Sequence, residues 1–371
     1  MEKPTMNNTI TIFVTAYNVA PYLERFFENL SRQTVTDYEL LIIDDGSTDD
    51  TAQIIKNHAE TDNRIRLIEI EHVGISGARN LVFENLRTDL VTSLDADDYF
   101  DDNYLKHLLD AQKKYDADLV ISNIVYRTPE LEETSRFKFR KEALYSESDF
   151  DKIVPQLLSE NRLNYLYGKL YKAEYLSGLT VEPDVMQGSD TMIVMQYILK
   201  IKSIAVIENY DYNYINYKSR SVTSYRGSKY FGRLFRINRF VYELWNEHGR
   251  MTPELQRVID GRILKSGESA LKHIARSKDS KKLQYKKASE VINSADYRWS
   301  FDRQKLCGNL DSFDFKVIVP GAENEYIDYV RGIVKEEKRG KRVRKLRKFC
   351  PDFLFNIYHK TKIKLGLIPP D

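Results

Sequence analysis

The 371-residue sequence predicts an α/β fold, in which a mainly parallel, Rossmann-like central sheet flanked by helices is followed by an all-helical C-terminal region. Strand-like and helix-like segments alternate at short intervals over residues 1–125, which is typical of parallel α/β sheets. The polar, glycine-containing loops all follow strand ends, and open α/β sheets bind their ligands at that edge. After about Arg226, long amphipathic segments replace the alternation. We therefore expect a first domain over residues 1–222 and a helical region over residues 223–371.

Each element is expected from its hydrophobic period and its end signals. Pro21 suits the first turn of a helix, and Ser47 suits an N-cap. The charged segment 130–141 is expected to be a surface excursion. The expected strands cover residues 10–16, 38–43, 65–70, 90–95, 119–126 and 203–207. The expected helices start near Pro21 and Ser47 and cover residues 78–86, 105–115, 150–158, 189–199, 230–248 and 255–275.

Composition limits the class of protein. Cys307 and Cys350 are the two cysteines, without metal-ligand spacing, so neither a disulfide framework nor a zinc site is indicated. No signal peptide precedes Ile10, and no apolar run approaches the ~20 residues that cross a bilayer. We expect a protein of the cytoplasm, bound peripherally at the inner face of the cell membrane.

The membrane expectation comes from a basic tail. The net charge is +2, but residues 331–371 carry 13 Lys and Arg against 4 Asp and Glu, whereas residues 1–330 carry 44 against 51. Eight basic residues between Lys338 and Lys348 surround Val343 and Leu346, which predicts a basic amphipathic helix suited to an anionic membrane surface. Docking on the acidic body or on a second subunit is the alternative. Nucleic acid is not expected as a partner.

The run Asp95-Ala96-Asp97-Asp98 is the most informative motif. It follows the apolar segment 90–94, which reads as a buried strand. Repulsion among clustered carboxylates favours either protonation or a cation, and all-oxygen ligands suit Mg²⁺ or Mn²⁺. The alternative is a set of solvated acids that cap the next helix. We expect Asp97 and Asp95 to hold a divalent metal.

Four further motifs fall at strand ends or helix starts, where one ligand could contact all of them. Small residues and an aromatic ring after the first strand suit a nucleotide, and a carboxylate after the second strand could accept the imide N–H of uracil. An arginine early in a helix could reach a base or a diphosphate, and an aspartate at a later helix start could be a general base. Each motif taken alone could equally be a turn or a helix cap. The motifs are Thr15-Ala16-Tyr17-Asn18, Asp44-Asp45-Gly46-Ser47, Gly74-Ile75-Ser76-Gly77-Ala78-Arg79-Asn80 and Gly188-Ser189-Asp190.

Together these motifs resemble those of the family 2 glycosyltransferases, which have the GT-A fold, over residues 9–220. The resemblance implies that Thr15, Ala16, Tyr17 and Asn18 bind the nucleotide and that Asp45 reads uracil. It also implies that Arg79 helps to hold the donor and that Asp95, Ala96 and Asp97 contact it. Asp97 would ligate the metal, with Asp95 toward the ribose or the metal shell, and Asp190 would be the catalytic base. Lys218 and Arg220, in a tyrosine-rich segment, are expected to close over the donor phosphates. The family usually has Glu before the base, where this chain has Ser189.

The resulting hypothesis is an inverting, metal-dependent glycosyltransferase. It would move a sugar from a UDP-sugar to a hydroxyl of a glycan acceptor, such as a polyprenyl-diphosphate-linked precursor of a cell-surface polysaccharide. A glycoprotein acceptor is an alternative. Because Ser189 replaces the usual Glu, a catalytically degenerate scaffold that binds nucleotide sugars is another. A nucleotidyltransferase would need a Gly-rich basic loop after the first strand, and residues 15–21 lack one.

Overall fold

The computed structural model describes residues 10–138, 140–183, 185, 188–217, 228–313 and 316–338. The chain packs as two compact units, Met1–Ser224 with Phe240–Leu255, and Tyr225–Arg239 with Gln256–Asp371. Each unit is described by itself. The expected domain boundary at residue 222 falls outside the described residues, so it stays a prediction.

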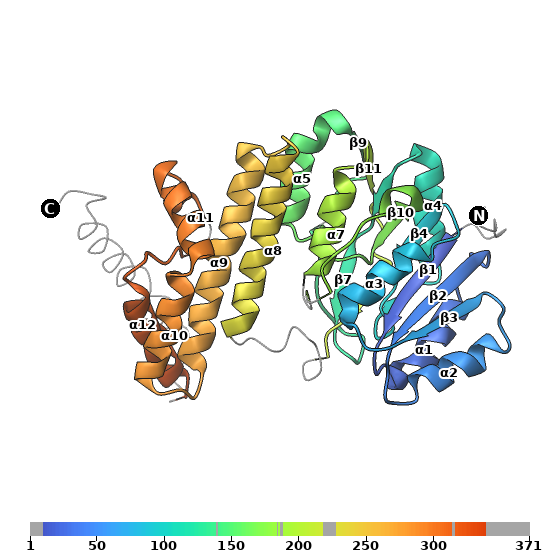
Figure 1. Ribbon diagram of the computed structural model, residues 1–371, viewed down its shortest axis with the longest axis horizontal. Helices are drawn as coiled ribbons and strands as arrows, with labels where there is room; N and C mark the ends of the chain where they lie inside the picture. The colour runs from blue at the N-terminus through green and yellow to red at the C-terminus, as the bar shows by residue number, and fades with distance from the viewer. Residues whose placement is uncertain are drawn as a thin grey trace. The chain divides into compact units, whose positions relative to one another are not determined.

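The first unit contains an eight-stranded mixed sheet, and its N-terminal half is parallel (Figure 1). The strand order β3-β2-β1-β4 is that of a doubly wound α/β sheet, and α1 to α3 connect these strands in turn. The sequence predicted this part of the fold correctly. The elements are β1 (Ile10–Ala16), α1 (Ala20–Ser31), β2 (Tyr38–Asp45), α2 (Thr51–Ala59), β3 (Ile65–Ile70), α3 (Gly74–Glu84) and β4 (Leu90–Ser93).

Alternating side chains of β1 face the two layers of helices. Ile10, Ile12 and Val14 belong to the buried cluster that contains Phe26 of α1. Phe13 points to the opposite face, where its ring meets Phe83 of α3 edge-on at 6.2 Å. Both faces of this sheet are therefore covered, as the near-continuous apolar strand sequences require.

The second half of the large sheet combines antiparallel and parallel pairs. Strand β10 runs antiparallel between β4 and β6, β11 pairs parallel with β6, and β9 closes the edge antiparallel. Helix α7 begins at Ser189 and so carries the candidate base in its first turn. The elements are α4 (Tyr104–Tyr115), β6 (Leu119–Ile121), β9 (Ala143–Ser146), α5 (Phe150–Ser159), β10 (Lys169–Lys172), α6 (Ala173–Leu176), α7 (Ser189–Ile198) and β11 (Ser203–Val206).

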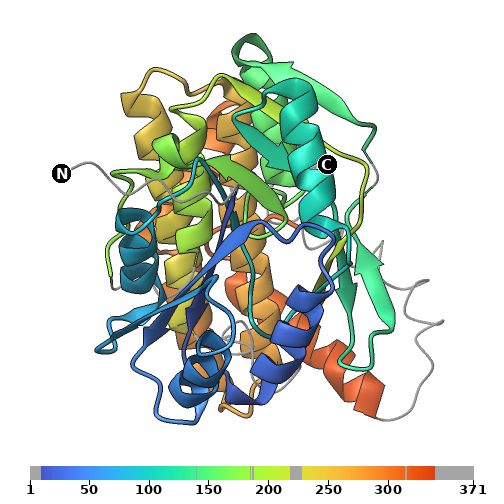
Figure 2. The same ribbon diagram turned by 90° about the vertical axis from the view of Figure 1, so that its right-hand side faces the viewer.

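A smaller, four-stranded sheet lies beside the large one in the same unit, and the sequence did not predict it. The strand expected over residues 119–126 is divided after Ile121, and its second part, β7, joins this sheet. The segment expected as an irregular excursion contains the exposed strand β8, which is drawn with β7 in teal-green at the right of Figure 2. The order is β5 (Tyr99–Phe100), β12 (Tyr212–Ile215), β7 (Ile124–Arg127) and β8 (Glu133–Arg136).

The helical region is confirmed. Gly267 of α9 allows the Tyr297 ring of α11 to pack against the helix backbone, because an added Cβ would lie 2.3 Å from that ring. Ser280 and Ser294 cap α10 and α11 by accepting hydrogen bonds from Leu283 N and Tyr297 N. No helix among the described residues is long and apolar enough to cross a membrane. The helices are α8 (Ser228–Glu247), α9 (Pro253–Arg276), α10 (Lys281–Ile292), α11 (Ala295–Leu306) and α12 (Glu323–Lys338).

Candidate active site

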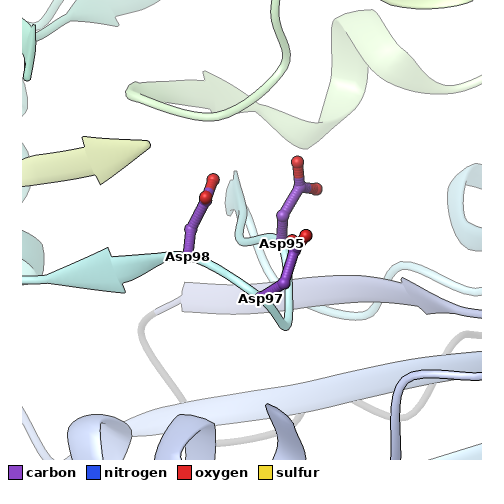
Figure 3. Close-up of side chains that lie close together, drawn as sticks. All are labelled: Asp95, Asp97 and Asp98. Carbon is purple, nitrogen blue, oxygen red and sulfur yellow. The ribbon is translucent and has the colours of Figure 1, made fainter. Parts of the chain in front are cut away.

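Three carboxylates converge in the loop that joins β4 to β5. Oxygen atoms of Asp95, Asp97 and Asp98 lie within 4.8 Å of one another, and Figure 3 shows the three side chains leaving one loop. Burial, the neighbouring Asp97 and Asp190 raise the pKa of Asp95 to about 7, against the opposing effect of Arg79. Burial also raises the pKa of Asp97 and of Asp98. A cluster of acids that resists ionisation fits a divalent cation, which replaces the missing protons.

Asp98 differs from its two neighbours because both of its oxygens are already bound. Its Oδ2 accepts a hydrogen bond of 2.7 Å from the Tyr212 hydroxyl, and its Oδ1 accepts one of 2.8 Å from the Ile215 amide. These bonds tie the acidic loop to β12. Asp95 and Asp97 therefore remain as the pair available to a metal, as the D-x-D pattern indicated, whereas the Ala96 side chain points into the hydrophobic core.

A second group of expected residues forms a candidate nucleobase site at the ends of β1 and β2. The Tyr17 ring, 46% exposed, stacks on His72 with ring centres 4.3 Å apart. Asp45 is buried, and its Oδ1 accepts a 2.7 Å hydrogen bond from Val73 N. Its Oδ2 lies 3.0 Å from His72 Nδ1. A carboxylate and an exposed aromatic ring that both contact His72 suit the edge and the face of a nucleobase.

The rest of the first motif has a local structural role. Asn18 has a φ of 52°, and its Oδ1 accepts hydrogen bonds from the Thr48 and Asp49 amides at 2.8 and 3.3 Å. These bonds hold the turn after β2. Ala16 is buried in the core, and Thr15 pairs with Ile43 in the sheet, so a ligand could contact this pair chiefly through the backbone.

The candidate base is held by α3. Arg79 Nη1 donates to Asp190 Oδ1 and to Ser189 Oγ, both at 2.6 Å. The Leu166 amide donates to Asp190 Oδ2 at 3.3 Å. Arg79 influences the pKa of Asp95 as well, so the guanidinium is electrostatically close to both the acidic loop and the candidate base. The structure thus brings Asp95, Asp97, Arg79 and Asp190 into one group. Lys218 and Arg220 lie outside the described residues.

One buried cation beside this group was missed by the sequence reading. Lys169 of β10 is 1% exposed, and its Nζ donates to the carbonyls of Tyr165 and Tyr167 at 2.6 and 3.3 Å. Burial lowers its pKa to about 7, against the effect of Asp190. Lys169 braces the segment whose Leu166 amide contacts the base. A lysine within an apolar strand pattern was the available signal.

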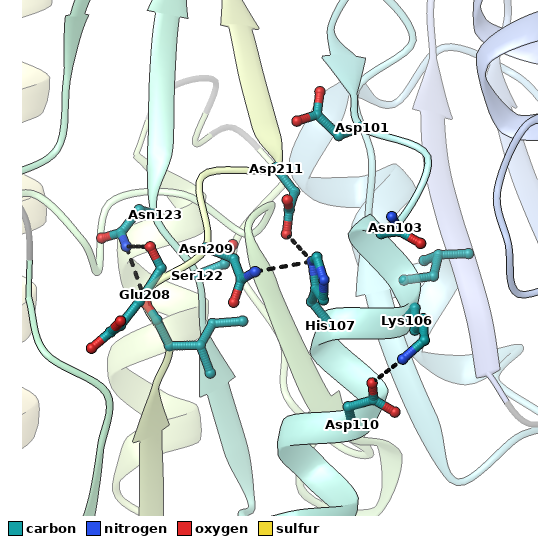
Figure 4. Close-up of polar contacts among 12 residues, drawn as sticks. Asp101, Asn103, Lys106, His107, Asp110, Ser122, Asn123, Glu208, Asn209 and Asp211 are labelled. Carbon is teal, nitrogen blue, oxygen red and sulfur yellow. Dashed lines mark hydrogen bonds and ion pairs between the residues drawn. The ribbon is translucent and has the colours of Figure 1, made fainter.

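A further polar cluster joins α4 to the segment before β12 (Figure 4). His107 Nδ1 lies 2.8 Å from Asp211 Oδ2 and 3.0 Å from Asn209 Nδ2. The structure thus gives this histidine two defined partners. The contact between His107 and Asp211 links α4 to the segment before β12. Neither residue belongs to the acidic loop.

The fold and this group of residues define an α/β protein with an acidic loop and a buried carboxylate at the strand ends. Residues 11–179 match the family described as glycosyl transferase family 2. Glycosyltransferase GlyA of Streptococcus pneumoniae serotype 4 is 28% identical over 344 residues, covering 89% of this chain and 46% of the relative. Chondroitin synthase of Escherichia coli is 36% identical over 105 residues, which is 28% of this chain and 15% of that protein.

Solved structures agree on the fold. TarS residues 1–349 of S. aureus superimposes with a TM-score of 0.58 at 15% identity, covering 90% of this chain and 93% of that one. The chain spans about half of GlyA and a smaller part of chondroitin synthase. Residues 11–179 of this chain are therefore similar to the glycosyl transferase family 2, and the chain has a fold similar to that of TarS, the GT-A fold.

Proposed function

We propose that the chain transfers a sugar from a UDP-sugar to a hydroxyl group of a glycan acceptor, with inversion and with the help of Mn²⁺ or Mg²⁺. The observation that carries this proposal is the grouping of the Asp95/Asp97 pair with Asp190, the carboxylate that Arg79 holds on α7. The UDP part of the proposal draws on the stack of Tyr17 on His72 and on Asp45, which also contacts His72. It also draws on TarS, a protein of similar fold crystallised with UDP-GlcNAc (TM-score 0.53, 17% identity).

The chemistry follows from the residues. Asp97 and Asp95 would hold a divalent cation, and the bound cation would stabilise the negative charge of the leaving diphosphate. Asp190 accepts the proton of the acceptor hydroxyl as that oxygen bonds to the anomeric carbon. The bond from this carbon to the diphosphate breaks, and its electron pair leaves with UDP. One displacement inverts the configuration, so no nucleophilic side chain is needed. A positioned general base contributes about 10²–10⁴-fold to such a rate.

The acceptor is proposed from the sequence of the tail. A basic amphipathic segment over residues 331–371 would hold the enzyme at the inner face of the membrane, near a polyprenyl-diphosphate-linked precursor of a surface polysaccharide. Residues 339–371 lie outside the described residues, so this part of the proposal depends on their sequence. GlyA and the other relatives reported above are bacterial proteins.

UDP release from a panel of UDP-hexoses and UDP-N-acetylhexosamines tests the reaction. With Mn²⁺, we expect the wild type to turn over at least one donor, and we expect Asp97→Asn and Asp190→Asn to lower that rate by about 10²-fold or more. Asp110→Asn is the matched control, because Asp110 is an exposed partner of Lys106 on α4. Full activity of Asp190→Asn would contradict its role as base. No turnover by the wild type on any donor would favour the scaffold.

A further inference from the structure

Helix α3 makes an unusual set of contacts, all with the segment that leads to the candidate base. The Asn80 side chain pairs with the Val181 backbone in both directions, donating to its carbonyl at 2.8 Å and accepting from its amide at 3.1 Å. The Ser76 hydroxyl donates to the Val185 carbonyl. Arg79, one turn further along the helix, reaches Ser189 and Asp190. One face of α3 therefore holds the backbone before α7 at two places and the side chains of the first turn of α7 at a third.

The geometry of Arg79 is that of a structural ion pair. The residue is 5% exposed, and its bond to Asp190 is a short, charge-assisted contact of 2.6 Å between side chains that are 6% and 17% exposed. The same Nη1 also serves Ser189. Both contacts use Nη1, whereas Nε is buried without a hydrogen-bond partner in the part of the chain that the structure describes. The guanidinium is therefore held at one nitrogen, and its 5% exposure leaves little of it for a diphosphate to contact.

The two oxygens of Asp190 are not equivalent. Oδ1 faces a cation at 2.6 Å, and this contact stabilises negative charge on that oxygen. Oδ2 has a long amide contact of 3.3 Å with Leu166 N. A proton arriving from an acceptor hydroxyl therefore meets less competition at Oδ2 than at Oδ1.

We propose that Arg79 is a positioning residue for the base, which fixes Oδ1 of Asp190 and leaves Oδ2 to take the acceptor proton, and that it is not a ligand of the donor diphosphate. This inference rests on the proposed function. In the step concerned, the acceptor O–H bond breaks, the oxygen bonds to the anomeric carbon, and the hydrogen is transferred to Oδ2 while UDP leaves with its electron pair.

Ser189 gives this arrangement a feature specific to this chain. A glutamate at that position would be a second carboxylate beside the same guanidinium, and the two acids would share its charge. The serine hydroxyl accepts from Arg79 at 2.6 Å without adding charge. With serine in place of the usual glutamate, Asp190 is the one carboxylate among the described residues that forms an ion pair with Arg79.

The test separates positioning from donor binding in Arg79→Lys and Arg79→Gln. UDP affinity is measured by calorimetry in Mn²⁺, and kcat and KM are measured separately for UDP-sugar hydrolysis. We expect the UDP dissociation constant to stay within about threefold of wild type, whereas kcat falls by about 10²-fold because the base is misplaced. The fall in kcat should be larger in Arg79→Gln than in Arg79→Lys, because the lysine keeps a positive charge beside Oδ1 of Asp190.

Arg66→Gln is the matched control, because Arg66 forms a comparable pair with the fully buried Glu39 on the strands and is not part of the candidate site. It should change stability without lowering kcat, and thermal unfolding of each variant establishes that it is folded. A UDP dissociation constant raised tenfold or more in both Arg79 variants, with kcat retained, would overturn the positioning role. Absence of UDP binding by the wild type would instead refute the proposed function, and the assignment of Arg79 with it.

Discussion

Asp95 makes the stability of the metal-free protein depend on pH in an unusual direction. Its pKa is raised from 3.8 to about 7 by burial, Asp97 and Asp190. Between these two pH values the folded chain holds a proton that the unfolded chain releases. The contribution of Asp95 to the free energy of unfolding is therefore complete below pH 3.8 and is lost as pH rises toward 7.

The size of this effect follows from the pKa difference. A change from 3.8 to about 7 corresponds to at most about 4 kcal/mol. Because Asp95 keeps part of its surface exposed, solvent screening reduces the effect, and we expect a loss of about 2 kcal/mol between pH 5 and pH 8. A bound Mn²⁺ takes the place of the proton, so stabilisation by the metal should increase over the same interval.

Urea unfolding at several pH values, in EDTA and in Mn²⁺, measures both effects. Asp95→Asn should remove most of the loss with pH and should make the protein more stable than wild type at pH 8 in EDTA. Asp110→Asn, on the exposed face of α4, should follow the wild type. The reasoning would be refuted by the same loss of stability with pH in Asp95→Asn and wild type, or by a metal effect that is equal at pH 5 and pH 8.

Three other expectations concern the nucleobase site, the helical unit and the tail. Tyr17→Ala should weaken UDP binding by about 1–3 kcal/mol in calorimetry, since it removes the aromatic face for stacking. An unchanged affinity would mean that the uracil ring binds elsewhere. Gly267→Ala should cost about 1–3 kcal/mol in urea unfolding, because its Cβ would meet the Tyr297 ring, whereas Gly332→Ala on the open face of α12 should be neutral or stabilising. Deleting residues 339–371 should abolish sedimentation with phosphatidylglycerol vesicles, and retained binding would show that the tail is not the anchor.

The elements that have a regular hydrophobic pattern and a buried face could be predicted from the sequence. Strands β1 and β3 lie at the expected residues, because each is an apolar run with clear ends. Helix α3 begins at Gly74, four residues before the expected start at Ala78, since the helix includes part of the glycine motif that was expected to be a loop. The long helices α8 and α9 match the amphipathic period within two residues at each end.

The smaller sheet could not be predicted in the same way. No sequence signal marks a break between β6 and β7, since residues 119–126 are apolar apart from Ser122 and Asn123. These two residues nevertheless carry the chain from one sheet into the other. The exposed strand β8 has no buried face, so its charged sequence shows no period. These strands form because they pair with residues far away in the sequence, and no local sequence pattern indicates such pairing.

The sequence indicated which residues belong to the candidate site, but it indicated few of the contacts among them. The acidic loop, Asp45, Tyr17 and Asp190 lie at the strand ends and helix start where the motifs suggested. The contacts of Arg79 with Ser189 and Asp190 join residues 110 and 111 positions apart, which a motif scan cannot reveal. Asp98 read as a third acid of the metal cluster, and its bonds to β12 became visible only in the folded chain.

Calorimetry of UDP binding, first with Mn²⁺ and then with EDTA, tests the central claim most directly when it is applied to wild type and Asp97→Ala. The account predicts binding by the wild type in Mn²⁺, strong weakening in EDTA, and loss of the metal effect in Asp97→Ala. Asp110→Ala should bind as the wild type does. Absence of UDP binding by the wild type in Mn²⁺, or equal binding by Asp97→Ala, would contradict the claim that the acidic loop forms a metal-assisted site for a nucleotide sugar.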